Sequence, residues 1–291
     1  MSGHLAVDAG QTGIRTRAGD DEREFPGILT SEPLIPQLAA LIRGLGTFDL
    51  VSIGTTGLTA EETDPTALRE LVGAGQVLMA HDSVTSYLGA LGDQRGAVVA
   101  AGTGVVTLAV GATAVARVDG WGYLMGDAGS GYWIGRAALD AVMRAHDGRG
   151  EATALTERVR ADFPDLEQAY IELQGDHGRV RRIASYARVV AELAGTDEVA
   201  RGICTAAAQE LAHSVITGLE RVGEAEQAAP DVCAIGGVFR SDAVAGPFAA
   251  ALRERWERVG IRDPLGDGID GAARLPEVTP GSALYGLIAR S

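Results

Sequence analysis

Residues 5–13, LAVDAGQTG, form an apolar strand followed directly by a turn with two glycines, a threonine and an aspartate at the strand end. Residues 96–104, GAVVAAGTG, repeat this pattern, and each copy leads into a second strand, over 14–19 and 105–110. A third strand over 114–118 extends the second copy as a meander. The repetition predicts one glycine-turn hairpin in each of two related lobes.

Apolar spacing outside the hairpins alternates between the strand and helix periods. Strands are expected over 50–54, 76–80 and 232–235, and helices over 34–43, 65–73, 83–91, about 242–258 and about 280–289, with mainly helical structure from about 130 to 222. Strands and helices in alternation predict an α/β fold with some antiparallel edges.

Composition excludes several classes of protein. The 291 residues are 46% hydrophobic and 22% charged, which is typical of a globular chain and favours two domains. No apolar run reaches the roughly 18 residues of a transmembrane helix, and Met1 to His4 lead directly into a strand, so neither a membrane span nor a signal peptide is expected. Cys204 and Cys233 lack the spacing of a zinc site or disulfide framework, which favours a reducing cytoplasm.

The charged residues restrict the possible ligands and the ways in which the chain can bind phosphate. There are 25 basic residues, all of them arginine, against 39 acidic ones, and the formal net charge is −14. A nucleic-acid-binding protein normally has a basic face, so we expect no nucleic-acid partner. Without lysine the chain has neither a P-loop nor a Schiff-base residue, so phosphate binding must rely on glycine turns, hydroxyls, arginines and a metal.

The two glycine turns are candidate phosphate sites. Glycine lets the backbone approach an anion closely, so Gly10, Gln11 and Thr12 in one turn, and Gly102, Thr103 and Gly104 in the other, can contact a nucleotide tail from two sides. Asp8 at the first strand end can hold Mg²⁺, which prefers hard oxygen ligands. The alternative is two ordinary hairpin turns, because turns favour the same residue types.

Asp82 follows the apolar strand over 76–80 and precedes a helix. It can be a general base that accepts the proton of a substrate hydroxyl during phosphoryl transfer, because ligands of α/β sheets bind at the carboxyl ends of the strands. The alternative is a helix N-cap, a position that favours aspartate. We interpret the adjacent His81 as a packed or exposed residue rather than a catalytic one.

Residues 120–135, GWGYLMGDAGSGYWIG, hold six glycines, two of the three tryptophans and one carboxylate. Gly120, Trp121 and Asp127 suit a sugar, since the indole offers an apolar face to the ring and the carboxylate accepts from hydroxyls. The alternative is an irregular loop with a packed aromatic residue beneath it and Ser130 as the N-cap of the next helix.

Gly236 and Gly237 follow the strand over 232–235, and such a turn allows an adenine or ribose to lie against the backbone. On its own a double glycine is a weak signal. The arginines at 179, 181, 182 and 188 are more typical of a solvated helix face than of an anion site.

Taken in chain order, these motifs resemble the ATPase fold shared by actin, sugar kinases and Hsp70, and in particular the N-acetylglucosamine kinases grouped with the BadF/BadG/BcrA/BcrD ATPases. DAGQTGIR is similar to the phosphate-1 hairpin, which Arg15 closes, AAGTG to phosphate-2 and AIGGVFRS to the adenosine segment. The stretch over 120–135 is similar to the family's GWG…GDEGS…WIG signature.

The resemblance implies a two-lobed, ribonuclease H-like fold with a nucleotide cleft between the lobes. One lobe would comprise residues 1–94 with 277–291 and the other 95–276. It implies an ATP- and Mg²⁺-dependent kinase for an amino sugar, such as N-acetylglucosamine, that acts as a homodimer. Asp82 would be the general base, Asp127, Gly120 and Trp121 would contact the sugar, Thr103 would lie near both phosphate and sugar, and Asp8 would organise the metal.

Two departures from the family pattern leave the sugar open among glucosamine, N-acetylglucosamine, N-acetylmuramate and related hexoses. Ala128 replaces a glutamate of the signature, and the asparagine of an early sugar-binding loop has no counterpart around residues 25–32. Two other functions remain as alternatives: an Fe–S activator-type ATPase of the same grouping, and a sugar or nucleotide sensor without turnover.

Overall fold

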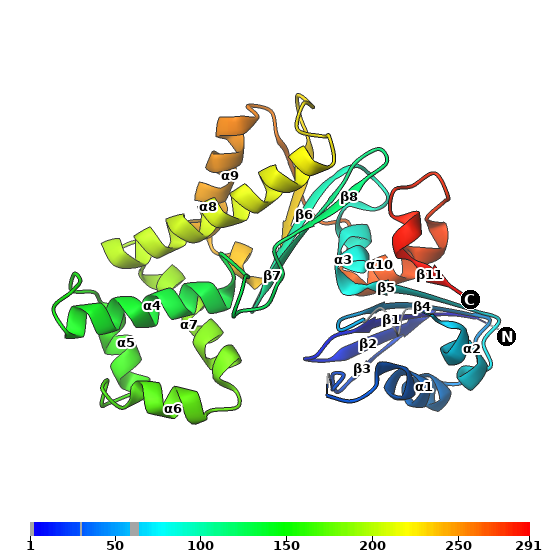
Figure 1. The fold of residues 1–291 in the computed structure, drawn as a ribbon, viewed down its shortest axis with the longest axis horizontal. Helices are drawn as coiled ribbons and strands as arrows, with labels where there is room; N and C mark the ends of the chain where they lie inside the picture. Colours follow the sequence, from blue (N-terminus) through cyan, green and yellow to red (C-terminus); the bar gives the residue numbers. More distant parts are fainter. Residues whose placement is uncertain (1–2, 30, 59–63) are drawn as a thin grey trace. The chain divides into compact units, whose positions relative to one another are not determined.

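The computed structural model describes residues 3–29, 31–58 and 64–291. The chain divides into two compact units (Figure 1). The first contains residues 1–98, 110–115 and 262–291, and the second contains residues 99–109 and 116–261.

A six-stranded mixed sheet forms the centre of the first unit, in the order β11-β5-β4-β1-β2-β3. Its strands are β1 (His4–Ala9), β2 (Ile14–Ala18), β3 (Asp21–Phe25), β4 (Leu50–Thr55), β5 (Gln76–His81) and β11 (Ala289–Arg290). Strands β1, β4 and β5 run parallel, while β2, β3 and β11 are antiparallel to their neighbours. The three parallel strands are covered on both faces, which accounts for their nearly continuous apolar sequences.

Helices cover both faces of this sheet (Figure 1). Helix α1 (Leu34–Leu45) and helix α2 (Thr66–Val72) pack on one face, where the buried side chains of α1 recur at the helical period. Helix α3 (Asp82–Leu91) and helix α10 (Gly268–Arg274) lie on the other face, where Ala6 of β1 packs against Ile269 and Ala272.

The end of the chain differs from the prediction. The helix expected over about 280–289 is a short 3₁₀ turn, Tyr285–Leu287, followed by the edge strand β11. Gly281 and Gly286 weaken any helix there, and pairing of Ala289 with Met79 uses the open edge of β5.

Helix α10 was not predicted from the sequence. A capping box formed by Asp267 and Asp270 stabilises its N-terminus and compensates for the low helix propensity of its two glycines. A Cβ on Gly271 would lie 1.7 Å from the Thr85 carbonyl oxygen, so glycine is required for α10 to approach α3 this closely. This contact fixes Asp267 beside the carboxyl ends of the parallel strands.

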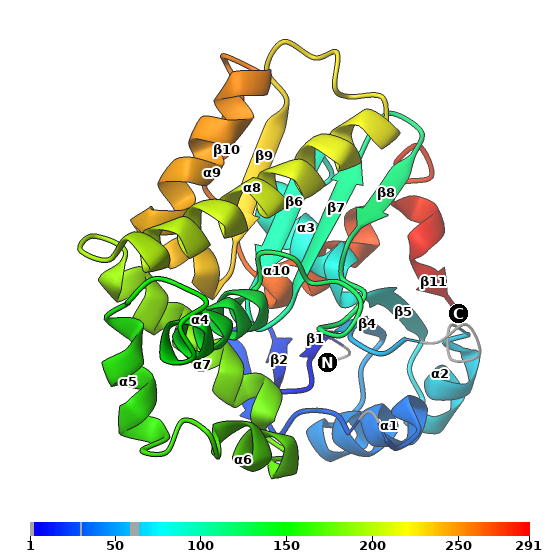
Figure 2. The ribbon, with the colours of Figure 1, turned by 60° about the vertical axis from the view of Figure 1, so that its left-hand side comes forward.

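The second unit is built on a five-stranded sheet in the order β10-β9-β6-β7-β8. The strands are β6 (Gly96–Ala101), β7 (Val105–Val110), β8 (Val115–Val118), β9 (Asp231–Ile235) and β10 (Gly260–Arg262). The predicted hairpin and meander over β6–β8 are present. Helix α8 (Glu198–Arg221) packs on this sheet, where Ser214 and Thr107 share a buried hydrogen bond of 2.7 Å (Figure 2).

The remaining helices of the second unit are α4 (Gly131–His146), α5 (Leu155–Asp162), α6 (Ala169–Gly175), α7 (Arg179–Leu193) and α9 (Asp242–Arg255). Helices α4 and α7 pack closely: a Cβ on Gly135 would lie 1.9 Å from the carbonyl oxygen of Ile183. The mainly helical structure predicted for about 130–222 is therefore present. Among the described residues, no helix is long and apolar enough to cross a membrane.

The units differ from the predicted lobes of 1–94 with 277–291 and 95–276. Residues 262–276, predicted in the second lobe, belong to the first unit because α10 packs on α3 and β1. The sequence around α10 has too few apolar residues to indicate this attachment.

Candidate active site

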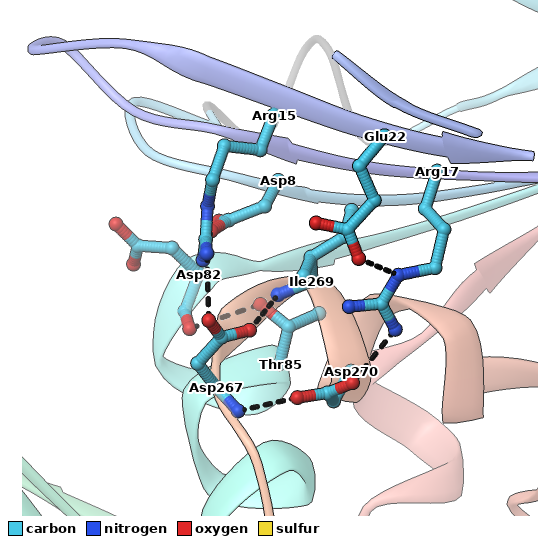
Figure 3. A network of polar contacts seen from close by, with 9 residues as sticks. All are labelled: Asp8, Arg15, Arg17, Glu22, Asp82, Thr85, Asp267, Ile269 and Asp270. Atoms are coloured by element: carbon cyan, nitrogen blue, oxygen red, sulfur yellow. Dashed lines mark hydrogen bonds and ion pairs between the residues drawn. The ribbon is translucent and has the colours of Figure 1, made fainter. Parts of the chain in front are cut away.

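The first unit places two carboxylates on one guanidinium, with a third carboxylate near them (Figure 3). Asp8, near the end of β1, and Arg15 on β2 are directly opposite in the antiparallel register, so their side chains share a face. Arg15 Nη2 donates to Asp8 Oδ2 over 2.9 Å, and Nη1 donates to Asp267 Oδ2 over 2.6 Å. Asp82 is the third carboxylate of this network.

Burial is the main cause of a raised pKa for Asp8, and the charges of Asp267 and Asp82 raise it further, while Arg15 lowers it. The single guanidinium of Arg15 therefore neutralises only part of the negative charge of these carboxylates, and a further cation would be stabilised here. The described residues contain no group of three or more His, Cys, Asp or Glu arranged to hold a metal. Mg²⁺ is usually held by one or two carboxylates plus phosphate and water, so Asp8 fits it as a partial ligand rather than as part of a cage.

Asp82 lies at the edge of the sheet where the parallel strands end. Asp8 pairs with Gly54 on β4, and Gly54 pairs with Ala80 on β5, so the ends of β1 and β5 lie level. Asp82 is the first residue of α3 and not its N-cap, because His81 occupies the cap and its Nδ1 accepts from the Ser83 amide. The N-cap interpretation of Asp82 is therefore wrong, and a ligand-facing role remains for its half-exposed side chain.

The predicted phosphate-1 turn is closed by the Gly10 amide, which donates to the Gly13 carbonyl over 3.0 Å. Gln11 and Thr12 at its tip are exposed. The side chain of Thr12 is thus available to a ligand beside Asp8 and Arg15.

The phosphate-2 turn lies in the second unit, against the start of α4. The Gly102 amide donates to the Gly104 carbonyl over 2.8 Å, and Gly102 and Thr103 are exposed. The amides of Gly131 and Tyr132 donate to the carbonyls of Gly102 and Thr103 over 2.8 and 3.0 Å. The glycine-rich loop that precedes α4 is therefore held against this turn.

Asp127 is brought to the same turn. The residue is buried, with 7% of its surface exposed, and a Cβ on Gly104 would lie 2.7 Å from the Asp127 Oδ2. Oδ1 accepts from the Gly122 amide over 3.2 Å. Burial, followed by the charge of Asp119, raises the pKa of Asp127.

Asp119, which the sequence analysis did not single out, organises this loop. Its carboxylate accepts from the amides of Gly120, Asp127 and Ala128 over 2.7, 2.7 and 2.8 Å. Asp119 and Asp127 both have left-handed backbone, with φ of 59° and 62°. Left-handed backbone at non-glycine residues is typical of functional loops, and the Asp-Gly pair at 119–120, which favours a turn, is the sequence signal that could have identified Asp119.

Trp121 is 59% exposed, so the alternative of an aromatic residue packed beneath the loop is wrong for this tryptophan. The Arg117 guanidinium lies 4.7 Å from the centre of its ring. The remainder of the alternative is correct, because Ser130 does cap α4 through the Trp133 amide.

A cavity of about 840 Å³ adjoins the phosphate-2 turn within the second unit. Its wall includes Thr103, Gly237 and, from α7, Arg181 and Arg188. Gly236 at the end of β9 has φ of 102°, and a Cβ there would lie 2.3 Å from the Ala101 carbonyl oxygen. The predicted adenosine turn thus passes directly over the end of β6, beside a cavity within the usual size range of ligand sites.

The arginines of α7 are divided between two roles. Arg182 stacks on Phe163 with its guanidinium 4.2 Å from the ring centre, as part of the helix surface. Arg188 is 84% exposed along its side chain, as predicted for a solvated face, yet it lines the cavity with Arg181.

The structure therefore gathers the predicted residues into two groups, one in each unit. Asp8, Gly10–Thr12, Arg15 and Asp82 belong to the first unit, and Gly102–Gly104, Gly120, Trp121, Asp127 and Gly236–Gly237 belong to the second. The sequence analysis missed Asp267 and Asp119. The spacing Asp267-x-x-Asp270 resembles a capping box and was a usable signal. Of residues 25–32, where the sugar-loop asparagine was sought, residue 30 lies outside the described part.

A model of the BadF/BadG/BcrA/BcrD ATPase family matches residues 37–275. An N-acetylmuramic acid/N-acetylglucosamine kinase of Clostridium acetobutylicum is 30% identical over 223 residues, which cover 72% of this chain and 70% of that protein.

Solved structures show the same fold. A structure from Chromobacterium violaceum, provisionally assigned as an N-acetylglucosamine kinase, has a TM-score of 0.73 and 25% identity, covering 94% of this chain and 98% of that one. A ROK family glucokinase of Streptomyces griseus, in complex with glucose and AMPPNP, has a TM-score of 0.53 and 18% identity, covering 94% and 98%. The α/β architecture is thus that of the sugar kinases and actin-like ATPases.

Proposed function

The chain belongs to the BadF/BadG/BcrA/BcrD ATPase family, and from this premise we propose that it is an ATP-dependent kinase that phosphorylates a hydroxyl group of an amino sugar. The relatives named as N-acetylglucosamine kinases support this activity. N-acetylglucosamine, N-acetylmuramate or a close relative is the proposed acceptor.

The observation that carries the proposal is the pair of carboxylates, Asp8 and Asp82, at the carboxyl ends of the parallel strands β1 and β5 in one sheet (Figure 3). Phosphoryl transfer to an alcohol needs a group that accepts the hydroxyl proton and positive charge near the phosphates. In our proposal Asp82 accepts the proton. Asp8 would hold Mg²⁺, which neutralises charge on the phosphates.

The second unit supplies groups suited to the nucleotide and the sugar. We assign the adenosine to the cavity beside Gly237, and the phosphates to the backbone amides and hydroxyls of the two glycine turns. Asp127 and Trp121 would contact the sugar, through hydroxyl groups and the apolar ring face. Most of the rate enhancement would then come from positioning and fixed electrostatics.

The proposal extends to the cellular setting. We expect a cytoplasmic enzyme, because ATP is its phosphate donor, and a homodimer, as the family resemblance implies. Size-exclusion chromatography with light scattering measures the oligomeric state directly.

The test is ADP release with Mg·ATP over a panel of glucosamine, N-acetylglucosamine, N-acetylmuramate and glucose. We expect turnover with at least one N-acylated sugar well above the rate with ATP alone. No acceleration by any sugar of the panel would contradict the kinase proposal. It would favour the sensor alternative if ATP or a sugar still binds in calorimetry.

Asp82→Asn is the matched variant for this assay. It removes the proton acceptor and keeps the side-chain shape, so we expect kcat to fall roughly 10²–10⁴-fold, the usual contribution of a general base. ATP binding should remain close to wild type in calorimetry. A variant with near-normal sugar phosphorylation would exclude Asp82 as the base.

The Fe–S activator alternative has little structural support. Cys204 and Cys233 are both buried, and burial raises the pKa of the Cys204 thiol to about 11, so it is protonated and inaccessible at neutral pH. A cluster needs thiolate ligands at the surface of a dimer interface. The described cysteines do not fit that requirement.

A further inference from the structure

The Asp119 carboxylate joins the two ends of the loop that holds Asp127. Asp119 directly follows β8, and Asp127 and Ala128 lie eight and nine residues further along the chain. Its Oδ1 accepts from the amides of Gly120 and Asp127, each over 2.7 Å, and its Oδ2 accepts from the Ala128 amide over 2.8 Å. Both oxygens are therefore used, and one side chain closes the loop.

Two consecutive amides, those of Asp127 and Ala128, donate to the same carboxylate. The φ and ψ angles of Asp127 lie between these amides, so neither angle can change much without breaking a hydrogen bond. Bonds to a charged acceptor are roughly twice as strong as neutral ones. They hold Asp127 in left-handed backbone, at φ of 62°, which is unfavourable for a residue with a Cβ. Asp119 therefore determines the backbone conformation of Asp127.

The backbone conformation of Asp127 directs its side chain to the phosphate-2 turn. Its Oδ1 accepts from the Gly122 amide over 3.2 Å, and its Oδ2 lies where a Cβ on Gly104 would come within 2.7 Å. The carboxylate thus lies between the sugar loop and the turn that we assign to the phosphates. Any rotation of the Asp127 backbone would move the carboxylate away from this turn.

Several unfavourable features accompany the approach of Asp119 to the far end of the loop. Asp119 itself has left-handed backbone, at φ of 59°. A Cβ on Gly126 would lie 2.4 Å from Asp119 Oδ1, so residue 126 must be glycine for the carboxylate to reach the amides. After burial, the charge of Asp119 is the next cause of the raised pKa of Asp127, so the two carboxylates repel each other. Unfavourable conformations that the surroundings enforce in this way are concentrated at functional sites.

We propose that Asp119 is a positioning residue for sugar binding: by holding the amides of Asp127 and Ala128, it keeps the Asp127 carboxylate where it accepts from hydroxyl groups of the sugar. This role rests on the proposed kinase function, in which Asp127 contacts the sugar. Asp119 makes no contact with the sugar and acts only through Asp127. The loss of the Asp119 carboxylate should therefore weaken sugar binding and leave ATP binding unchanged.

Asp119→Asn and Asp197→Asn separate positioning from a general loss of stability. Asp197 is a buried carboxylate of the same unit that also accepts from backbone amides, those of Ala200 over 2.8 Å and Ala154 over 2.7 Å, but it caps α8. Asparagine has only one acceptor oxygen, so both variants should have a lower melting temperature. Only Asp119→Asn should raise KM for the sugar, about 10- to 100-fold, the usual effect of losing a residue that orients a binding group. KM for ATP should remain that of the wild type in both.

A double-mutant cycle tests whether Asp119 acts through Asp127. It compares kcat/KM for the sugar in the wild type, Asp119→Asn, Asp127→Asn and the double variant. If Asp119 acts only by placing the Asp127 carboxylate, the double variant should lose no more activity than Asp127→Asn alone. Should Asp119→Asn fail to fold, Asp119→Gly takes its place, because glycine adopts a φ of 59° without strain.

Two results would overturn the positioning role and leave the kinase function intact: independent, multiplying losses in the cycle, or the same KM for the sugar in Asp119→Asn and Asp197→Asn. A wild-type protein without sugar phosphorylation would contradict the proposed function instead. The cycle is then measured on the dissociation constant of the sugar by calorimetry. If no sugar of the panel binds to the wild type, the positioning role is overturned as well.

Discussion

Gly236→Ala is the change that most directly probes how the second unit builds its cavity. The residue has φ of 102° and ψ of 172°, a region of backbone conformation that is essentially restricted to glycine. An alanine Cβ would lie 2.3 Å from the Ala101 carbonyl oxygen, where ordinary contacts begin at 3.4 Å. The ends of β9 and β6 would therefore have to separate by about 1 Å, the difference between those two distances.

Two costs add to give the expected destabilisation. Backbone strain in this region costs about 1–3 kcal/mol, and inserting a methyl group into a packed contact costs about 1–3 kcal/mol more. The total is about 2–6 kcal/mol, which corresponds to a melting temperature lower by about 4–12 °C at roughly 2 °C per kcal/mol for a chain of this size.

Gly237→Ala is the matched control. A Cβ on this neighbouring glycine, which lines the cavity, would have no atom of the described residues within 4 Å. Its substitution should leave the melting temperature unchanged or slightly higher, since alanine restricts the unfolded chain. Calorimetry with ATP should show weaker binding for Gly236→Ala, because the turn moves. Equal melting temperatures for the two variants would refute the close approach of β9 to β6.

Two further predictions concern the charged groups of the site. Arg15→Met removes the bonds to both Asp8 and Asp267, and we expect the free energy of unfolding, measured with urea, to fall by about 1.5–3 kcal/mol. Arg23→Met is the control, because it loses only an exposed ion pair with Asp21 and should have a much smaller effect. Similar losses of stability in the two variants would contradict a special role for Arg15. Burial is the main cause of the raised pKa of Asp127. The neutral carboxyl therefore stabilises the folded protein fully when the pH is below the ordinary aspartate pKa of 3.8. This stabilisation is lost as the pH rises through the raised pKa of the folded protein. Asparagine does not titrate, so the free energy of unfolding of Asp127→Asn, relative to that of the wild type, should increase as the pH rises above 3.8, by at most about 1.4 kcal/mol per pH unit. If the difference between the two free energies did not depend on pH, the raised pKa would be contradicted.

Elements with a strong apolar period were predictable. The strand pairs around the two glycine turns and helix α1 follow from local spacing, because each element buries the face that its own sequence makes apolar. Strand β3, with sequence DEREF, was missed because it is an exposed edge strand, where charged residues replace the alternation. The short strand β11 was mistaken for a helix because two paired residues carry no period at all.

The sequence by itself determined which residues are chemically able to act. The absence of lysine, the two glycine turns and the acidic residues Asp8, Asp82 and Asp127 are properties of the chain, and they restrict phosphate binding to amides, hydroxyls and arginines. Only the tertiary structure decided which partners these residues have. Helix α10 brings Asp267 to Arg15 across 252 residues of sequence, and the role of His81 as the cap of α3 leaves Asp82 in the first turn of the helix. The reason is that hydrogen bonds and pKa shifts depend on distances of a few ångströms and on burial, which are set by packing between elements far apart in the chain.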